Sequence, residues 1–394
     1  MNPEFYAAFR SFLGQKPSDD QGTLRQTPSR SPAGAAAKHS SHKPRAFQIV
    51  RSFADGAEHE ERPAAPPREP NESIRVAFKQ RDAVRDAARK GWDFLRSVAR
   101  PDSNAVPFSD PLQGGDTLVS ALALKWLTSL DEPMRDHLLG QAPAVLVPEG
   151  RPTQDHLDRA AHWLSACRRS GRLSPESFYR QGRALLRSVR DVGGTKSPSW
   201  DVGITAQVLE PALQTLQHQR DAETFSEIQP LLAQVRHHLE SGAYLEGTAS
   251  YPTPETFLCQ VSELWRSTTP LSASLRIPIE DAVRRRWWST AGPMREPLAR
   301  RVLDLSCLII AAENLHLSEV NLSTARQELV KLQDPQGSFS PAAYRRSKGS
   351  FFIGSRAVTT IFAVRALEGQ PRTGGWGKGR HWTKTELDLA SRSA

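Results

Sequence analysis

Residues 201–209 read Asp201-Val202-Gly203-Ile204-Thr205-Ala206-Gln207-Val208-Leu209, and two further segments, 116–124 and 355–364, follow the same pattern. Each begins with an Asp or a Ser, has a small hydroxyl residue four positions later, and continues as a small and apolar helical face. Asp and Ser are favoured at helix N-caps, and an apolar helical face packs against a core. A weaker copy begins at Glu255, so the pattern indicates a helical repeat.

A helix and a loop with glycine or proline precede each clear copy, so the repeating unit is a pair of helices. The expected second helices of the pairs are 116–131, 153–168, 201–217, 254–267, 296–314 and 355–368. Apolar residues recur at spacings of three and four from 72 to 369, and runs of alternating β-type residues are absent. We therefore predict an all-α fold, a single α/α toroid of about six helix pairs whose inner helices line a central cavity.

The remaining chain is divided by composition. Residues 1–13 carry apolar side chains on one helical face and predict a short amphipathic helix. Residues 14–73 are rich in proline and serine without apolar periodicity, which predicts a disordered linker. The toroid domain is expected over 74–370, and a flexible basic tail over 371–394.

Composition limits the classes of partner and compartment. The chain has 394 residues, a formal charge of +9 and no uncharged apolar run long enough to cross a bilayer, so at most peripheral membrane contact is expected. Its basic residues interleave with acidic ones, which argues against nucleic acid binding. The three cysteines lie far apart in apolar patterns, which predicts buried thiols and a cytoplasmic protein. Delivery through the N-terminal leader, by a secretion system or to an organelle, is the alternative.

Residues 333–339, Gln333-Asp334-Pro335-Gln336-Gly337-Ser338-Phe339, resemble the QW motif of the terpene cyclase/protein prenyltransferase superfamily, with Phe339 where tryptophan is usual. The resemblance covers about residues 75–370 and implies a toroid like that of squalene–hopene cyclases. In that family the motif ties an outer helix to the next inner helix. Gln333, Gly337 and Phe339 are therefore expected to have structural roles.

Class II cyclases of this family use an Asp-x-Asp-Asp-Thr-Ala segment whose middle aspartate protonates an alkene, and residues 201–206 are similar to it. Asp201, Thr205 and Ala206 match, but Gly203 and Ile204 replace the second and third aspartates. Asp201 is therefore expected first as an N-cap and second as a general acid.

Cyclase activity would require that another residue replace the acid missing at Gly203. Asp116, Asp201 and Glu255 begin inner helices, so their carboxylates are expected around one mouth of the toroid. Close carboxylates raise one another's pKa, as a proton donor requires. Asp201 and Asp116 are the candidate catalytic residues, and Glu255 is expected beside the substrate.

A second cluster suits an anionic or isoprenoid ligand. Arginines bind diphosphates through paired hydrogen bonds, and indole faces stabilise cations. The candidate binding residues are Trp200, Arg284, Arg285, Arg286, Trp287 and Trp288. The alternative is a solvated face of an outer helix with buried tryptophans.

No resident metal is predicted. Asp304-Leu305-Ser306-Cys307 is loosely similar to two zinc ligands of the protein prenyltransferases, but the matching histidine is missing from residues 355–367. Cys307 is therefore expected in the core. No cofactor is required, and Mg²⁺ is expected only with a diphosphate substrate.

Two hypotheses of function follow. The resemblance implies an isomerase or lyase of the terpene cyclase type, which cyclises a linear isoprenoid, with or without a diphosphate, after general-acid protonation. The alternative is a non-catalytic or effector-like α/α toroid that has lost the acid motif and recognises a protein or a lipid partner.

Overall fold

The computed structural model describes residues 72–98, 117–127, 130–140, 142–143, 146–147, 152–192, 200–218, 222–266, 270–289, 292, 301–346 and 352–369. The predicted helix at 1–13, most of the 14–73 linker and the tail at 371–394 lie outside these residues. The first described helix begins at Glu72, two residues before the predicted domain boundary.

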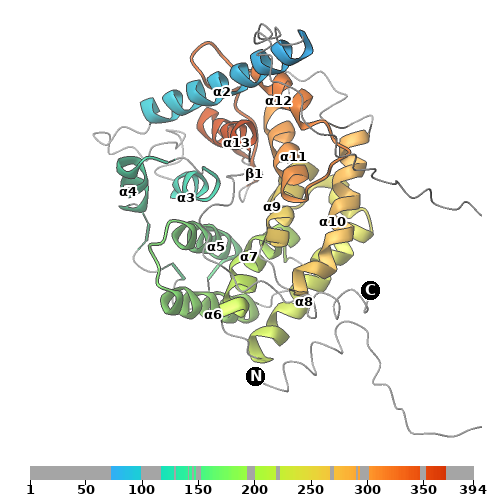
Figure 1. Ribbon diagram of the computed structural model, residues 1–394. Helices are drawn as coiled ribbons and strands as arrows, with labels where there is room; N and C mark the ends of the chain where they lie inside the picture. The colour runs from blue at the N-terminus through green and yellow to red at the C-terminus, as the bar shows by residue number, and fades with distance from the viewer. Residues whose placement is uncertain are drawn as a thin grey trace, which may run out of the picture.

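Six helices form an inner layer (Figure 1). They are α3 (Thr117–Trp126), α5 (Gln154–Arg169), α7 (Val202–His218), α9 (Pro254–Arg266), α11 (Val302–Asn314) and α13 (Arg356–Glu368). Each contacts the next in this order, and α13 contacts α3, so the layer is a closed ring. The ring confirms the predicted all-α class and four of the six predicted second helices to within one residue, whereas α11 begins at Val302 and not at 296. The first, α3, ends earlier than expected.

Six further helices lie outside this ring (Figure 1). They are α2 (Glu72–Val98), α4 (Glu132–Gly140), α6 (Pro175–Asp191), α8 (Ala222–Glu240), α10 (Pro270–Trp288) and α12 (Leu322–Lys331). The first outer helix, α2, packs against the last inner helix, α13. Two short elements complete the described chain, a 3₁₀ turn at Ala243–Glu246 and an antiparallel pairing of β1 (Arg345–Arg346) with β2 (Phe352–Ile353).

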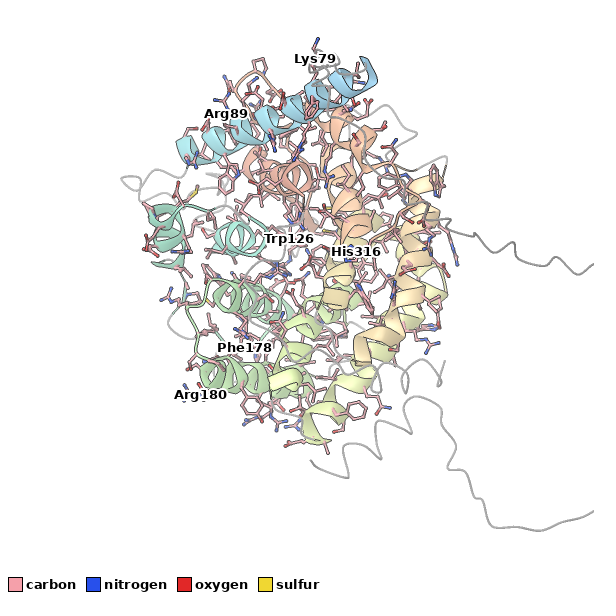
Figure 2. The ribbon with its side chains drawn as sticks, viewed as in Figure 1. Lys79, Arg89, Trp126, Phe178, Arg180 and His316 are labelled. Atoms are coloured by element: carbon pink, nitrogen blue, oxygen red, sulfur yellow. The ribbon has the colours of Figure 1, made fainter. Side chains whose placement is uncertain are left out.

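The sequence of each layer explains its position. The inner helix α11 is mostly apolar and nearly all of its residues are buried, which is typical of a helix enclosed by others. The outer helix α6 has one apolar face, carrying Phe178, Leu185 and Val189, and one polar face. Figure 2 shows the same contrast, with Lys79 and Arg89 projecting outward from α2 and Trp126 inside the ring. None of the described helices meets the length and apolarity needed to cross a membrane.

Caps confirm two of the predicted helix starts. The Ser355 hydroxyl accepts a hydrogen bond from the Val358 amide at 3.1 Å, where α13 begins. The Asp201 carboxylate accepts one from the Gly203 amide at 2.9 Å, where α7 begins. Both bonds satisfy amides that have no partner within the helix.

Residues 333–339 join the end of α12 to α2 and α13. The Gln333 side-chain amide donates to the carbonyls of Ala87 and Gly337, at 2.8 and 2.9 Å. The Phe339 ring is buried, and its amide donates to Thr360 Oγ1 at 3.2 Å. These contacts agree with a structural role, and the family assignment of the segment stays a prediction.

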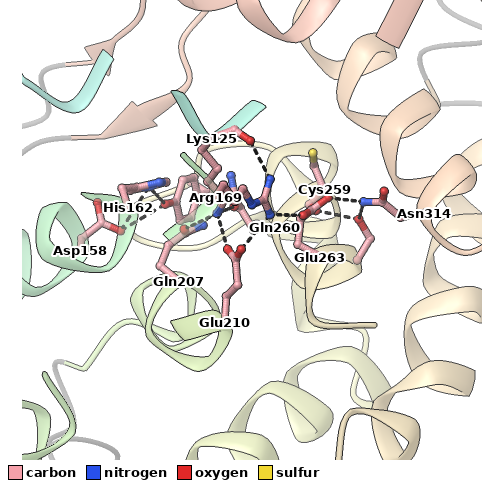
Figure 3. Close-up of polar contacts among 12 residues, drawn as sticks. Lys125, Asp158, His162, Arg169, Gln207, Glu210, Cys259, Gln260, Glu263 and Asn314 are labelled. Carbon is pink, nitrogen blue, oxygen red and sulfur yellow. Dashed lines mark hydrogen bonds and ion pairs between the residues drawn. The ribbon is translucent and has the colours of Figure 1, made fainter. Parts of the chain in front are cut away.

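At the level of Lys125, polar side chains extend across the interior of the ring. Lys125 on α3 pairs with Glu210 on α7 at 2.6 Å and donates to Gln260 on α9 at 3.2 Å (Figure 3). Arg169 on α5 pairs with Glu210 at 2.8 Å and also with Glu263 on α9. Because α3 and α9 are not neighbours in the ring, these bonds span its interior.

Candidate functional site

Asp201 combines a capping role with an unused oxygen. One carboxylate oxygen caps α7 through the Gly203 amide. The other, Oδ2, is buried and has no hydrogen-bond partner among the described residues. Capping was the first expectation for this residue, and the structure confirms it. Beside it, the buried Trp200 donates its indole N–H to Thr205 Oγ1 at 2.7 Å.

Gly203 stands where the motif resemblance predicts a catalytic aspartate, and the structure leaves no room for a side chain there. A Cβ at this position would lie 2.5 Å from Thr248 Oγ1 and 2.6 Å from a ring carbon of Tyr251. The Tyr251 ring therefore occupies the space into which an aspartate at 203 would point. A larger residue at 203 would therefore require Tyr251 or Thr248 to move.

Tyr251 belongs to a buried polar cluster centred on α5. Its hydroxyl donates to Asp158 Oδ1 at 3.2 Å and lies 3.3 Å from His162 Nε2. Arg345, at the start of β1, reaches into the ring and pairs with Asp158 at 3.1 Å and with Asp155 at 2.8 Å. Asp158, His162 and Tyr251 are all fully buried.

Burial controls the protonation of this cluster. It raises the pKa of Asp158, and the Arg345 guanidinium opposes that rise. Burial also holds the pKa of His162 well below its ordinary value, so its imidazole is neutral. It raises the pKa of the Tyr251 phenol well above the usual range, so its hydroxyl stays protonated.

A second buried acid pair lies at the starts of α9 and α11. Glu255 is fully buried, and one of its oxygens pairs with Arg286 on α10 at 2.5 Å. Its other oxygen has no hydrogen-bond partner among the described residues. Asp304 accepts from the Thr253 hydroxyl at 2.8 Å. Burial, reinforced by the Glu255 charge, raises the pKa of Asp304 to about 7.

The inner helices α5, α7, α9 and α11 therefore each place a buried acid near their start or at their N-cap. These residues are Asp158, Asp201, Glu255 and Asp304. The charges of Asp201 and Glu255 raise the pKa values of Asp158 and Asp304 respectively, so neighbouring acids are close enough to repel. The acids thus form two pairs, Asp158 with Asp201 and Asp304 with Glu255, and the expected gathering of Asp116, Asp201 and Glu255 at one mouth stays a prediction. Asp116 lies outside the described residues.

The arginines and tryptophans of α10 are not gathered into one site. Arg284 lies on the outside of the ring, paired with Glu280, Asp281 and Glu319. Arg285 is exposed, and the Trp288 side chain is 54% exposed. Only Arg286 and Trp287 are buried, and Arg286 is bound to Glu255. Exposed Arg285 and half-exposed Arg284 agree with the alternative of a solvated outer face, Trp288 is exposed where that alternative expected a buried ring, and the substrate-binding role of these residues stays a prediction.

The sequence argument missed Asp158, His162, Tyr251 and Arg345. Asp158 and His162 have the four-residue spacing of one helical face, a signal that could have drawn attention to them. Tyr251 lies in the loop before α9 and Arg345 lies in β1, and neither belongs to a motif, so only the folded ring reveals that they meet.

Metal binding has no support within the described part of the chain. No group of three or more His, Cys, Asp or Glu side chains there could hold a metal ion. The three cysteines are free and buried, as predicted, and burial raises the pKa of the Cys307 thiol well above its usual value. Cys307 is therefore a core residue.

Similarity to known proteins points in the same direction as the motif resemblance. A stretch of 143 residues is 29% identical to the drimenol cyclase drtB of Aspergillus calidoustus. The match covers 36% of this chain and 25% of that cyclase, so the chain spans about a quarter of the relative's length. No protein-family model matches the chain. The chain is thus distantly similar to a terpene cyclase.

Proposed function

We propose that this protein is a terpene-cyclase-like enzyme that protonates a linear isoprenoid and so starts its cyclisation. Similarity to a drimenol cyclase supports the reaction class. One structural observation carries the proposal: buried carboxyl groups lie at or near the starts of four successive inner helices, Asp158, Asp201, Glu255 and Asp304. Protonation of an alkene needs a neutral carboxylic acid held in place, and burial among other acids keeps a carboxyl neutral.

The balance of nearby charges supports retention of a proton. Asp155, Asp158 and Asp201 form one group, in which Arg345 pairs with the first two. Burial and the neighbouring Asp201 and Asp155 charges raise the pKa of Asp158, and Arg345 opposes that rise. On this proposal, Asp158 holds a proton until an alkene accepts it.

Aromatic side chains beside these acids would stabilise the carbocation that protonation creates. The rings of Tyr251, Tyr344, Phe362 and Trp126 form a continuous chain, with successive centroids 5.6, 5.2 and 5.3 Å apart. Aromatic faces attract cations. We propose an isoprenoid small molecule as the ligand, with Mg²⁺ needed only if the substrate carries a diphosphate.

The test is product formation by purified full-length protein. We would incubate it with geranyl, farnesyl and geranylgeranyl diphosphate and with squalene, with and without Mg²⁺, and identify products by mass spectrometry. A cyclised product, absent from heat-denatured protein, is expected. Failure of the folded protein to convert any of the four substrates would contradict the proposal.

A non-catalytic toroid is the second candidate, because of two observations. Tyr251 fills the space beside Gly203 where the family's acid would lie. Ion pairs from Lys125 and Arg169 also occupy the ring interior. On this hypothesis the protein binds a protein or a lipid partner through its outer surface, and the substrate assay above gives no product.

A further inference from the structure

Building on the proposed function, we propose that Asp158 on α5 is the proton donor, positioned by Tyr251 and His162. The acid would thus have moved from the Asp201 segment to a different inner helix. Three features support this: the space beside Gly203, the bonds to Asp158, and the chain of aromatic rings that begins at Tyr251.

In the Asp201 segment, no carboxyl group stands at the position of the missing acid. Gly203 has no carboxyl group, and the Tyr251 ring fills the adjoining space. Asp201 uses one oxygen to cap α7. The Tyr251 side chain therefore does two things. Its aromatic ring fills the space beside Gly203, and its hydroxyl donates to Asp158, so Asp158 is the acid nearest to that position through Tyr251.

Asp158 is held in a fixed geometry. The Tyr251 hydroxyl donates to one of its oxygens at 3.2 Å, and Arg345 pairs with the other at 3.1 Å. His162 lies one helical turn away, with Nε2 3.9 Å from Asp158 Oδ1 and 3.3 Å from the Tyr251 hydroxyl. A donor constrained from two sides meets the requirement for accurate proton transfer.

The environment of Asp158 suits a proton donor better than that of Glu255. Burial favours its neutral form, whereas Arg345 stabilises the carboxylate that remains after the proton has left. Tyr251 is also the first member of the aromatic chain that ends at Trp126. Glu255, by contrast, faces Arg286 of the outer helix α10.

The proposed step balances in atoms and charge. The Asp158 O–H bond breaks, and the π electrons of a terminal alkene form a new C–H bond with that proton. The other alkene carbon becomes a carbocation. The next alkene of the same substrate molecule attacks it, which closes a carbocycle and moves the positive charge to a further carbon of the substrate. Loss of a proton from the cyclised cation to water gives a neutral product, and water returns a proton to the Asp158 carboxylate.

The first experiment compares Asp158→Asn with Asp201→Asn and Asp304→Asn in the substrate assay. Folding of each variant is checked by circular dichroism and thermal unfolding. We expect Asp158→Asn to lose at least about 100-fold in product formation and Asp201→Asn and Asp304→Asn to lose less than about tenfold. Product formation by Asp158→Asn within tenfold of wild type overturns this assignment and leaves the proposed function standing. No product from wild type overturns the proposed function itself.

A second variant keeps the test valid if Asp158→Asn does not fold. Tyr251→Phe preserves the ring beside Gly203 and removes only the hydroxyl that contacts Asp158 and His162. Tyr244→Phe is the matched control, because Tyr244 is equally buried and its hydroxyl has no hydrogen-bond partner among the described residues.

For Tyr251→Phe we expect kcat to fall about tenfold or more and its pH profile to shift toward higher pH, with KM little changed. The hydroxyl donates to the Asp158 carboxylate, so its loss raises the pKa of that acid. Tyr244→Phe should match wild type. An unchanged kcat and pH profile in Tyr251→Phe would refute the positioning role and the assignment of Asp158.

Discussion

At the scale of single residues, a nearby cation limits how far burial raises the pKa of an acid. Asp304 and Asp158 are both buried and both have an acid nearby. Asp158 has Arg345 in contact, whereas the Arg301 guanidinium lies 4.0 Å from Asp304 and is partly exposed. Asp304 therefore depends on a bound proton for its stability in the folded state.

Asp304 should make the folded state less stable as pH rises. Its folded pKa of about 7 lies above the ordinary value of 3.8, so its contribution is fully present below pH 4 and is lost as pH rises through 7. Asp304→Asn should remove a slope of up to about 1.4 kcal/mol per pH unit in the free energy of unfolding. Urea unfolding between about pH 5 and 8 measures it.

Asp136→Asn is the matched control, since the Asp136 side chain is exposed. It should keep the pH dependence of wild type. Identical slopes for wild type and Asp304→Asn would show that Asp304 is ionised throughout this range.

Local residue roles could be predicted from the sequence, and long-range ones could not. The cap at Asp201 depends on an amide two residues away, so the local pattern was sufficient. In the cluster at Asp158, the partners Tyr251 and Arg345 lie 93 and 187 positions after Asp158 in the chain. Only the closure of the ring brings them together.

At the scale of elements, the connection from α12 to α13 depends on one close backbone approach. Gly337 has φ +86°, and a Cβ there would collide with the Lys90 carbonyl of α2. The turn thus brings the end of one outer helix against another, and the Gln333 amide binds both sides of the contact.

Gly337→Ala should destabilise the protein more than Gly171→Ala. Gly171 has a similar φ of +75°, but a Cβ there would meet nothing within 4 Å, so this variant isolates the cost of the backbone conformation. That cost is about 1 kcal/mol in either variant, and the collision at Gly337 should add about 1–3 kcal/mol. Chemical denaturation measures both, and equal losses would mean that the turn shifts freely away from α2.

The helices themselves were largely predictable, because their starts carry Asp, Ser or Glu before apolar faces. The α3 end was not, since α3 stops at Trp126 although the apolar pattern continues to 131. The β1–β2 pairing also escaped notice, because Arg345 and Arg346 give no strand signal, and tertiary contacts such as the bond from the Arg346 amide to the Ser250 carbonyl hold them.

At the scale of the whole molecule, charged side chains join helices across the ring. Lys125, Arg169, Glu210 and Glu263 connect α3, α5, α7 and α9, and Asn314 extends the connection to α11 by donating to Glu263 at 2.7 Å (Figure 3). Two cations face two anions, so the group is balanced and resists the removal of any one member.

Lys125→Met should lower the free energy of unfolding by about 3–5 kcal/mol, because it leaves Glu210 buried with one cation fewer. Lys331→Met, which breaks the exposed pair with Glu328, should cost less than about 1 kcal/mol. Thermal and urea unfolding compare the two. Similar losses in both variants would show that the interior ion pairs do not bind the ring together.

The closed ring also has a consequence for synthesis on the ribosome. Helices α2 and α3 find permanent neighbours on α13, the last inner helix of the ring to be translated. An open solenoid gains stability with each repeat that emerges. In this domain, α2 and α3 lack their contacts with α13 until almost the whole ring has left the exit tunnel. During that interval, the surfaces of α3 and α11 that pack against α13 in the folded domain remain exposed to solvent. We expect chaperones to bind the nascent chain in this state.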